Sequence, residues 1–218
     1  MVAQAAEDVA REIWRDSPHA ELGRDLGIAS WEALWANFTG GHPRLDEVRD
    51  WVPSYRDMVW RHALERCGAD SAAAPQLARA YIRFQRSGHP HIPGALDLVR
   101  RLHATGRPVG ILTNGPPDIQ RLKLDQLGID ECFSSIVISG EVGLGKPDPR
   151  VFEQALEALS ALPGDTVMVG DSWNRDVEGA AAAGMRSIWI SNGREAAAAI
   201  DGVSIVATTS EAGPLLGC

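Results

Sequence analysis

The chain has 218 residues, of which 44% are hydrophobic and 23% are charged. This length can bury a full hydrophobic core, and the composition is that of an ordinary globular protein. A disordered chain, a fibre and a membrane bundle are therefore excluded. The 29 acidic and 21 basic side chains leave a formal net charge of −8 at pH 7, which argues against nucleic-acid or membrane-surface binding.

The cysteines and the N-terminal residues indicate the cellular compartment of the protein. Cys67, Cys132 and Cys218 lie far apart and form no Cys-x-x-Cys pair, which fits reduced thiols. Residues 1–16 mix charged and apolar side chains and do not resemble a signal peptide. No apolar run approaches the roughly 18 residues of a membrane span. We expect a cytoplasmic protein, monomeric or homodimeric, without nucleic-acid or membrane partners.

The first 88 residues carry only helical periodicity. Apolar residues spaced three and four apart predict a first helix from Val2 to Ile13. Ser30 is a candidate N-cap for a second helix, and Pro53 stands where the first position of a later helix is expected. Five of the seven tryptophans fall within the first 60 residues. They favour the core of a helical bundle, with a substrate-binding wall as the alternative.

A Pro/Gly-rich hinge over residues 87–94 separates this helical region from the rest. Its two histidines suggest a metal site, but no further ligand stands nearby in the sequence. Beyond the hinge, short apolar strands alternate with helices, which predicts right-handed crossovers and a parallel sheet. The expected fold is α/β, with an α-helical module of residues 1–88 and a Rossmann-like sheet domain of residues 89–218. The strands are expected over 109–113, 136–139, 166–170, 187–191 and 204–207.

Ligands of parallel α/β sheets bind beyond the carboxyl ends of the strands, and three strand ends here carry suggestive residues. Thr113 and Asn114 offer a hydroxyl and backbone N–H groups that can cradle a phosphate, although Asn-Gly is also a common turn. Lys146, in a Gly/Pro-rich loop, can neutralise phosphate oxygens or be an ordinary surface lysine. Asp171 and Asp176 follow an apolar strand and suit Mg²⁺; acidic residues at a helix N-terminus are the alternative.

Together and in this order, the three strand ends resemble motifs II, III and IV of the haloacid-dehalogenase-like (HAD) hydrolase superfamily. The resemblance covers nearly the whole chain, with residues 1–88 as a helical cap of the C1 type and 89–218 as most of the Rossmann-like core. The stretches 137–143 and 179–184 and Phe152 are also typical. The chain is most similar to the branch with pyrimidine 5'-nucleotidases and N-acylneuraminate-9-phosphatases, with phosphoglycolate phosphatases as close rivals.

The resemblance implies an Mg²⁺-dependent phosphomonoesterase that hydrolyses a small phosphate ester through an aspartyl-phosphate. It implies that Thr113 and the Asn114 backbone bind the phosphate and that Lys146 holds the phosphate and the nucleophilic carboxylate together. Asp171 would ligate Mg²⁺, and Asp176 would support the metal directly or through water. Mg²⁺ and lysine would offset the charge around phosphorus. Haloacid dehalogenases generally lack this metal-ligand pair, which favours a phosphatase over a dehalogenase.

The cap would select the substrate, but its sequence indicates only a generic helical cap and does not identify the substrate. Arg44, in the loop 40–44, could face an anionic substrate, although a solvated loop is the alternative. The substrate and the pathway therefore stay open at this stage.

Motif I of the family, Asp-x-Asp after the first strand, is absent. Its first aspartate is the nucleophile and its second the general acid/base, yet no aspartate here has another two positions away. The chain opens in what resembles the first cap helix, so the first strand is missing as well. That strand would lie between the strands that end at Thr113 and Gly170. Its absence predicts two interior edges with unpaired backbone groups.

We consider three explanations for the missing motif. A misplaced start, with the true start upstream, is favoured because the other motif residues are all present. A truncation and a non-catalytic relative that acts through binding are the alternatives. In each case we expect the chain as written to be inactive.

Overall fold

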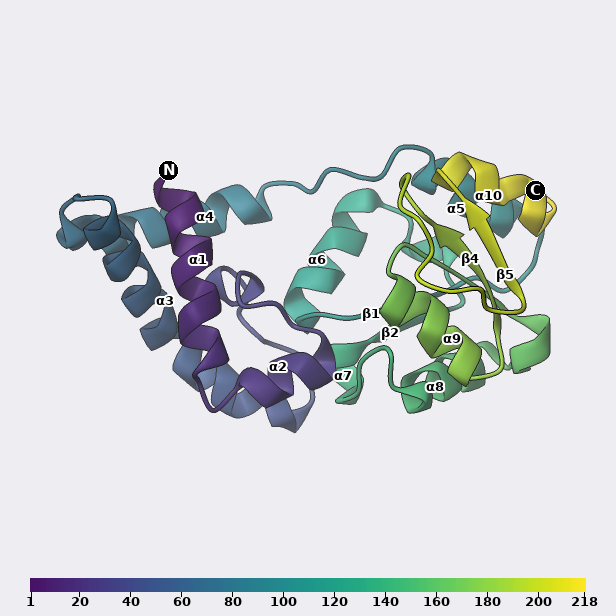
Figure 1. The fold of residues 1–218 in the computed structure, drawn as a ribbon, viewed down its shortest axis with the longest axis horizontal. Coiled ribbons are helices and arrows are strands. Elements are labelled where there is room, and N and C mark those ends of the chain that lie inside the picture. The colour runs from purple at the N-terminus through teal and green to yellow at the C-terminus, as the bar shows by residue number, and fades with distance from the viewer. The chain divides into compact units, whose positions relative to one another are not determined.

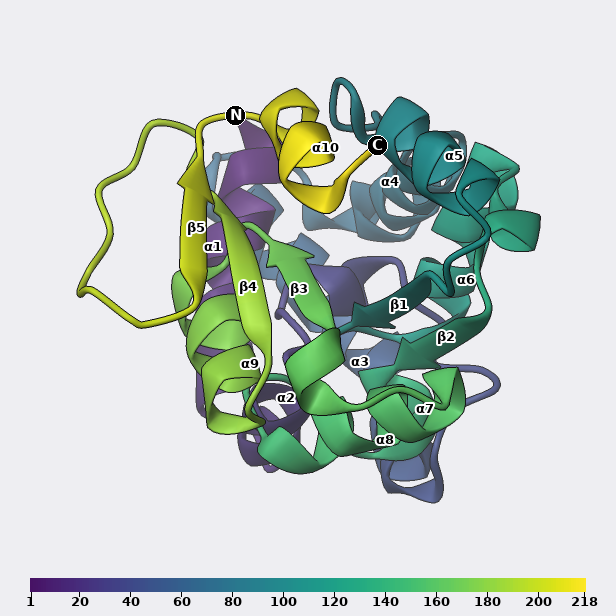
Figure 2. The same ribbon diagram turned by 90° about the vertical axis from the view of Figure 1, so that its right-hand side faces the viewer.

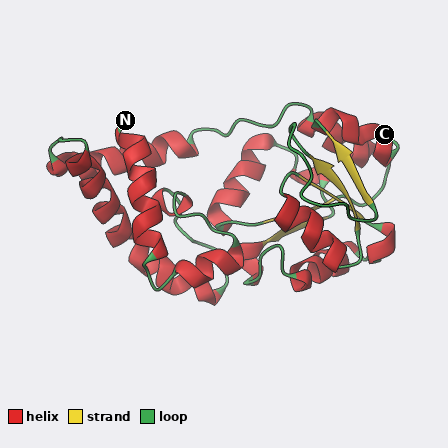
Figure 3. Ribbon diagram, viewed as in Figure 1, coloured by secondary structure: helices red, strands yellow, loops and turns green.

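The computed structural model describes all 218 residues, and they divide into two compact units. Figure 1 follows the chain through its elements, and Figure 3 shows that helices dominate. We call one part the helical unit; it comprises Met1–His89, Asn114–Gln126 and Ile138–Gly143. We call the other the sheet unit; it comprises Pro90–Thr113, Leu127–Val137 and Leu144–Cys218. The simpler division at residue 88 stays a prediction.

Helices that share one apolar core build the helical unit. Helix α1 packs on α3 and α3 on α4, and the core includes the fully buried side chains of Leu34, Trp35 and Tyr55. None of the helices is both long and apolar enough to span a bilayer. The elements are α1 (Val2–Arg15), α2 (Ala20–Leu26), α3 (Asp46–Arg66), α4 (Ala74–Arg86), α6 (Pro117–Leu127, its last residue in the sheet unit), α7 (Ser139–Val142) and short 3-10 turns at Glu32–Leu34, Pro43–Leu45 and Ser71–Ala73.

Two local predictions in this unit are wrong. Pro53 lies inside α3 instead of at its start, and the segment after Ser30 forms a 3-10 turn instead of an α-helix. The missing N–H of Pro53 removes one helical hydrogen bond. The helix continues because its buried stripe runs through the proline, from Val48 and Val52 to Tyr55 and beyond. Tertiary burial therefore outweighs the local preference of proline for a helix start.

The sheet unit alternates strands and helices as the sequence predicts. Strands β3, β4 and β5 are parallel, with Val167 opposite Arg186 and Ser187 opposite Val203. Each strand lies within one residue of its predicted limits. The elements are α5 (Ala95–Ala104), β1 (Gly110–Thr113), β2 (Ser135–Ile138), α8 (Pro149–Leu159), β3 (Val167–Gly170), a π-helical turn (Trp173–Glu178), α9 (Gly179–Ala182), β4 (Arg186–Ile190), β5 (Val203–Val206), α10 (Thr209–Leu216) and 3-10 turns at Asp130–Cys132 and Pro163–Asp165.

The strands form two separate sheets. One has the order β1-β2 and the other the order β3-β4-β5. Figure 2 shows the facing edges, with β2 beyond β1 on one side and β4 and β5 beyond β3 on the other. The two open edges belong to the strands that end at Thr113 and Gly170, as the sequence predicts.

Burial in the sheet unit is highest away from these two edges. All four residues of β3 are half-buried, whereas Ser187 to Ile190 of β4 are buried. A small core joins Leu98 of α5 to β4, β5 and α10. Inner strands of a parallel sheet are ordinarily buried on both faces, so the exposure of β3 reflects its position at the edge of its sheet.

Candidate functional site

A buried ion pair lies beyond the strands of the sheet unit. The Lys146 Nζ atom lies 2.6 Å from Oδ1 of Asp176, and the two side chains are 11% and 6% exposed. Lys146 comes from the loop before α8, and Asp176 comes from the π-helical turn after β3. The structure therefore brings together two residues that stand 30 positions apart and that the sequence assigned to one site.

The polypeptide around Asp176 fixes this carboxylate. The Ser172 N–H donates to Oδ2 of Asp176 at 2.9 Å, and the Asp176 N–H donates to the Ser172 carbonyl at 2.8 Å. A Cβ atom at Gly170 would lie 2.3 Å from Oδ2, so only glycine fits at this strand end. Both carboxylate oxygens of Asp176 thus have a donor, one from Lys146 and one from Ser172.

Close packing holds the Lys146 loop against α9. A Cβ atom at Gly179 would lie 2.6 Å from the Phe152 ring and 3.2 Å from the Cα atom of Pro147. The side chain of Asp148 accepts a hydrogen bond from the N–H of Arg150 and so caps α8, as its sequence predicts. These contacts position the backbone on both sides of the lysine.

Asp171 directly follows β3 and is exposed. Its carbonyl oxygen accepts hydrogen bonds from Nε1 of Trp189 at 3.1 Å and from Nη2 of Arg194 at 2.6 Å. The Arg194 guanidinium also lies over the Trp189 ring, 5.6 Å from its centroid. The backbone of Asp171 is therefore anchored while its carboxylate stays accessible to solvent.

The donor set fits a magnesium ion. Mg²⁺ prefers hard oxygen ligands, keeps several waters and often takes only one or two carboxylates from the protein. Asp171 offers an exposed carboxylate, and Asp176, in the π-helical turn that follows, offers a second whose oxygens also accept from Lys146 and Ser172. No group of three or more His, Cys, Asp or Glu side chains forms a cage for a metal that demands more protein ligands.

The predicted phosphate cradle divides between the units. Thr113 ends β1 in the sheet unit, and Asn114 begins a turn assigned to the helical unit. The Gly115 N–H donates to Oγ of Ser139 at 2.9 Å, and that hydroxyl donates to the Leu26 carbonyl at 2.6 Å. The Gly115 N–H therefore already has an acceptor within the protein. Donation from the Asn114 N–H to a phosphate stays a prediction.

Helix α6 supports the same turn from within the helical unit. The Gln120 side chain, which is buried, donates to the Asn114 carbonyl at 3.1 Å. A Cβ atom at Gly115 would lie 2.4 Å from Nε2 of Gln120, and this glycine has a φ of 138°. The turn is thus held by one side chain of α6 and by one hydroxyl after β2.

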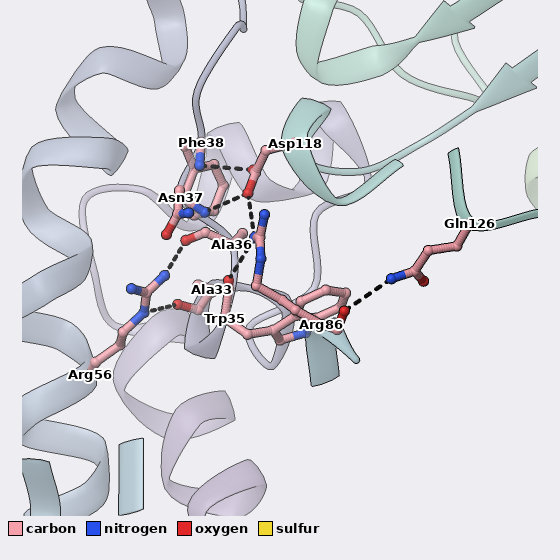
Figure 4. Close-up of polar contacts among 9 residues, drawn as sticks. All are labelled: Ala33, Trp35, Ala36, Asn37, Phe38, Arg56, Arg86, Asp118 and Gln126. Carbon is pink, nitrogen blue, oxygen red and sulfur yellow. Dashed lines mark hydrogen bonds and ion pairs between the residues drawn. The ribbon is translucent and has the colours of Figure 1, made fainter. Parts of the chain in front are cut away.

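A second buried charge cluster fixes the loop 35–38 (Figure 4). The Asp118 side chain, 8% exposed, accepts hydrogen bonds from the backbone N–H groups of Asn37 at 2.9 Å and Phe38 at 3.0 Å. Nη1 of Arg86 lies 2.9 Å from Oδ2 of the same carboxylate. Gln126 in turn donates to the Arg86 carbonyl at 2.9 Å. The aspartate thus ties α4, α6 and this loop together.

Arg56 holds the other side of that loop. It donates to the carbonyls of Ala33, at 2.9 Å, and Ala36. Burial of its guanidinium lowers the pKa of Arg56 to about 10.

Arg44, the candidate substrate contact, pairs with Asp25 at 2.6 Å and donates to the Gly143 carbonyl at 2.9 Å.

The sequence did not identify Ser139, Gln120 or Gly170 as site residues. Ser139 directly follows β2, so the rule that polar residues collect at strand ends could have found it. Gln120 and Gly170 carry no such signal, because their roles depend on side-chain approaches that only the folded chain defines.

Comparisons with known proteins agree on one family. A family model described as haloacid dehalogenase-like hydrolase matches residues 5–184. A phosphoserine phosphatase from Thermus thermophilus is 39% identical over 184 residues, 84% of this chain and 73% of that protein.

Two solved structures share the fold. A 2-haloacid dehalogenase from Pseudomonas syringae has a TM-score of 0.57 at 29% identity, covering 99% of this chain and 91% of the other. The putative HAD-hydrolase YfnB from Bacillus subtilis, bound to magnesium, has a TM-score of 0.59 at 24% identity, covering 99% and 92%.

Proposed function

Because this chain belongs to the haloacid dehalogenase-like hydrolases, we propose that it carries the phosphate- and metal-binding groups of a phosphomonoesterase. The observation that carries the proposal is the buried pair of Lys146 and Asp176, with Asp171 exposed after β3. A buried ammonium with one fixed carboxylate partner is a pre-positioned charge for an anionic substrate. The likeness to a phosphoserine phosphatase supports a small phosphorylated metabolite as the substrate class.

The proposed roles follow from where each group lies. Lys146 binds phosphate oxygens, while Asp176 keeps the ammonium in place. The Thr113 hydroxyl and the Asn114 N–H donate to the phosphate. Asp171 and Asp176 hold Mg²⁺, which when bound neutralises phosphate oxygens and acts as a Lewis acid.

The proposed reaction transfers the phosphoryl group to a carboxylate and then to water. The nucleophile and the general acid/base form an Asp-x-Asp pair in this family, and residues 1–218 contain no such pair. We therefore propose that residues 1–218 alone do not turn over and that a strand bearing this pair completes the site.

Phosphate release from a panel of small phosphate esters with Mg²⁺ tests the proposal. We expect background rates from residues 1–218 and a rate at least 100-fold higher from a version extended by an apolar strand and Asp-x-Asp. Asp171→Ala should abolish this gain. Asp165→Ala, which removes an exposed carboxylate elsewhere in the sheet unit, should retain it. Strong turnover by residues 1–218 alone would refute this account of the nucleophile.

Two other functions are kept because specific observations favour them. The absence of Asp-x-Asp favours a non-catalytic phosphate- or Mg²⁺-binding relative, which would bind phosphate yet stay inactive in the extended version. The likeness to a 2-haloacid dehalogenase favours carbon–halogen hydrolysis, which chloride release from 2-chloropropionate would reveal. Both alternatives leave the expected cytoplasmic location and the monomer or homodimer state unchanged.

A further inference from the structure

Arg194 reaches the end of β3 from a tight turn that follows β4. Its backbone N–H donates to the Ser191 carbonyl at 3.0 Å. The two residues between them, Asn192 and Gly193, have φ values of 51° and 78°. Asparagine and glycine are the residues that adopt this left-handed backbone most readily. The turn folds the chain back, so that the Arg194 side chain contacts Asp171, the residue that directly follows β3.

Three contacts fix the guanidinium of Arg194, although the residue is exposed. Nε donates to the Ser191 carbonyl at 2.9 Å, and Nη2 donates to the Asp171 carbonyl at 2.6 Å. Cζ lies 5.6 Å from the centroid of the Trp189 ring, within the range of a cation–π contact. That ring is buried, and its Nε1 donates to the same Asp171 carbonyl. Because the guanidinium already has a set orientation, it loses little side-chain entropy when it binds a ligand.

The charge of this guanidinium is not paired with a carboxylate. Its protein partners are two carbonyl oxygens and an aromatic ring, none of which carries a negative charge. Arg150, in the same unit, shows the contrast, because its Nη2 lies 2.6 Å from Oδ2 of Asp148. A guanidinium has five N–H donors, so the edge formed by Nη1 and Nη2 keeps donors for a planar anion.

The guanidinium also lies next to the proposed metal ligand. The Asp171 carbonyl that it contacts and the carboxylate of the same residue are separated by three carbon–carbon bonds. Covalent geometry therefore keeps Nη2 within about 8 Å of that carboxylate. Asp171, Arg194 and Lys146 all belong to the sheet unit. One small molecule can thus contact the arginine while its phosphate lies at Lys146 and Asp171.

We infer that Arg194 is a specificity-determining residue that binds a second anionic group of the substrate. That group is a carboxylate, whose two coplanar oxygens match the planar edge of the guanidinium. The substrate class is accordingly a phosphate monoester on a short carbon chain that also carries a carboxylate. This inference rests on the proposed function, because the ester phosphate has to lie at Lys146 and Asp171.

Two ligands that differ by one carboxylate test this inference. Both 3-phosphoglycerate and glycerol-3-phosphate have a three-carbon chain and a phosphate, but only the first has a carboxylate. We would measure the dissociation constants of both esters, and of inorganic phosphate, for residues 1–218 with Mg²⁺ by isothermal titration calorimetry. We expect 3-phosphoglycerate to bind at least about 10-fold more tightly than glycerol-3-phosphate, because only the carboxylate pairs with Arg194.

Variants of two arginines separate a direct contact from a structural role. Arg194→Ala should make the two dissociation constants equal. Arg194→Gln keeps an N–H donor for the Asp171 carbonyl but removes the charge, so it should also make them equal, and it decides if Arg194→Ala does not fold. Arg186→Ala removes an exposed arginine at the other end of β4 and should retain the full preference, which controls for net charge.

The outcomes that would overturn the inference differ from those that would overturn the proposed function. If Arg194 only supported the Asp171 backbone, its variants would weaken both esters alike and leave their ratio unchanged. That result, or equal binding of both esters by the unmodified protein, would refute the role of Arg194 and leave the phosphate site standing. If neither ester nor inorganic phosphate binds, the phosphate site itself is wrong, and the inference is overturned with it.

Discussion

The helical unit and the sheet unit differ in how completely residues 1–218 fill them. The helical unit buries Leu34, Trp35, Tyr55 and their neighbours in one continuous core. The sheet unit has a small core of five buried residues and leaves its apolar strands β1 and β3 half-exposed. A helix satisfies its own backbone, so a helical bundle can be complete with the helices it has. A strand depends on neighbouring strands to pair its N–H and C=O groups, so a strand at the edge of a sheet leaves one row of them unpaired within the sheet.

The difference extends to the buried charges. In the helical unit, Asp118 receives two backbone N–H groups and one arginine, so its charge is shared among several donors. In the sheet unit, the Lys146 ammonium and Asp176 form a compact pair at the edge of the proposed site. The first arrangement stabilises a loop, and the second leaves a cation positioned for a ligand.

The largest effect that we predict concerns the ion pair. Asp176→Ala should lower the free energy of unfolding by about 3–5 kcal/mol, because it removes the carboxylate that lies 2.6 Å from the largely buried Lys146 ammonium. The double variant Lys146→Met with Asp176→Leu should recover most of this loss. Urea denaturation measures both. A double variant as unstable as Asp176→Ala would show that the attraction within the pair dominates, and not the cost of keeping the Lys146 charge buried after its carboxylate is removed.

Two leucines of equal chemistry test the contrast in packing. Leu34→Ala, at a fully buried position of the helical unit, should cost about 2–5 kcal/mol. Leu112→Ala on β1 should cost about 1 kcal/mol or less, because that side chain is already partly in water. Thermal and urea unfolding compare the two variants. Equal losses would contradict the view that the side chains of β1, at the open edge of its sheet, are less buried than the helical core.

Gly170 tests the fit of the site itself. Gly170→Ala should cost about 1–3 kcal/mol, because its Cβ atom would meet Oδ2 of Asp176 at 2.3 Å. Gly164→Ala is the matched control, since no atom lies within 4 Å of a Cβ atom there. A control variant that loses as much stability as Gly170→Ala would rule out the close approach as the cause.

The smallest effect is a pH dependence in the helical unit. Burial lowers the pKa of His19, which packs on Trp51 at 4.8 Å between ring centroids, below its ordinary value of 6.5. The unfolded chain therefore binds this proton more readily, and stability present above pH 6.5 is lost as the pH falls below it. His19→Gln should reduce the fall in Tm between pH 7.5 and 5, whereas His62→Gln, at an exposed position, should leave it unchanged. Parallel melting curves for all three proteins measure this.

The sequence alone determined the alternation of strands and helices, and it predicted the open edges at β1 and β3. Apolar runs bounded by Gly and Pro placed β1 and β3, and Asp148 with Pro149 placed the start of α8. These features depend on local backbone preferences and on burial period, which a linear pattern records. The pattern also assigned Lys146 and Asp176 to one site before any distance was known.

Only the tertiary structure decided which atoms meet. The length of α3 through Pro53, the requirement for glycine at position 170 and the support of Asn114 by Gln120 all depend on contacts between segments. Side-chain approaches of this kind have no fixed spacing in the sequence, because the fold sets the distance between segments. For the same reason, the half-exposure of β1 and β3 became visible only once their neighbours in space were known.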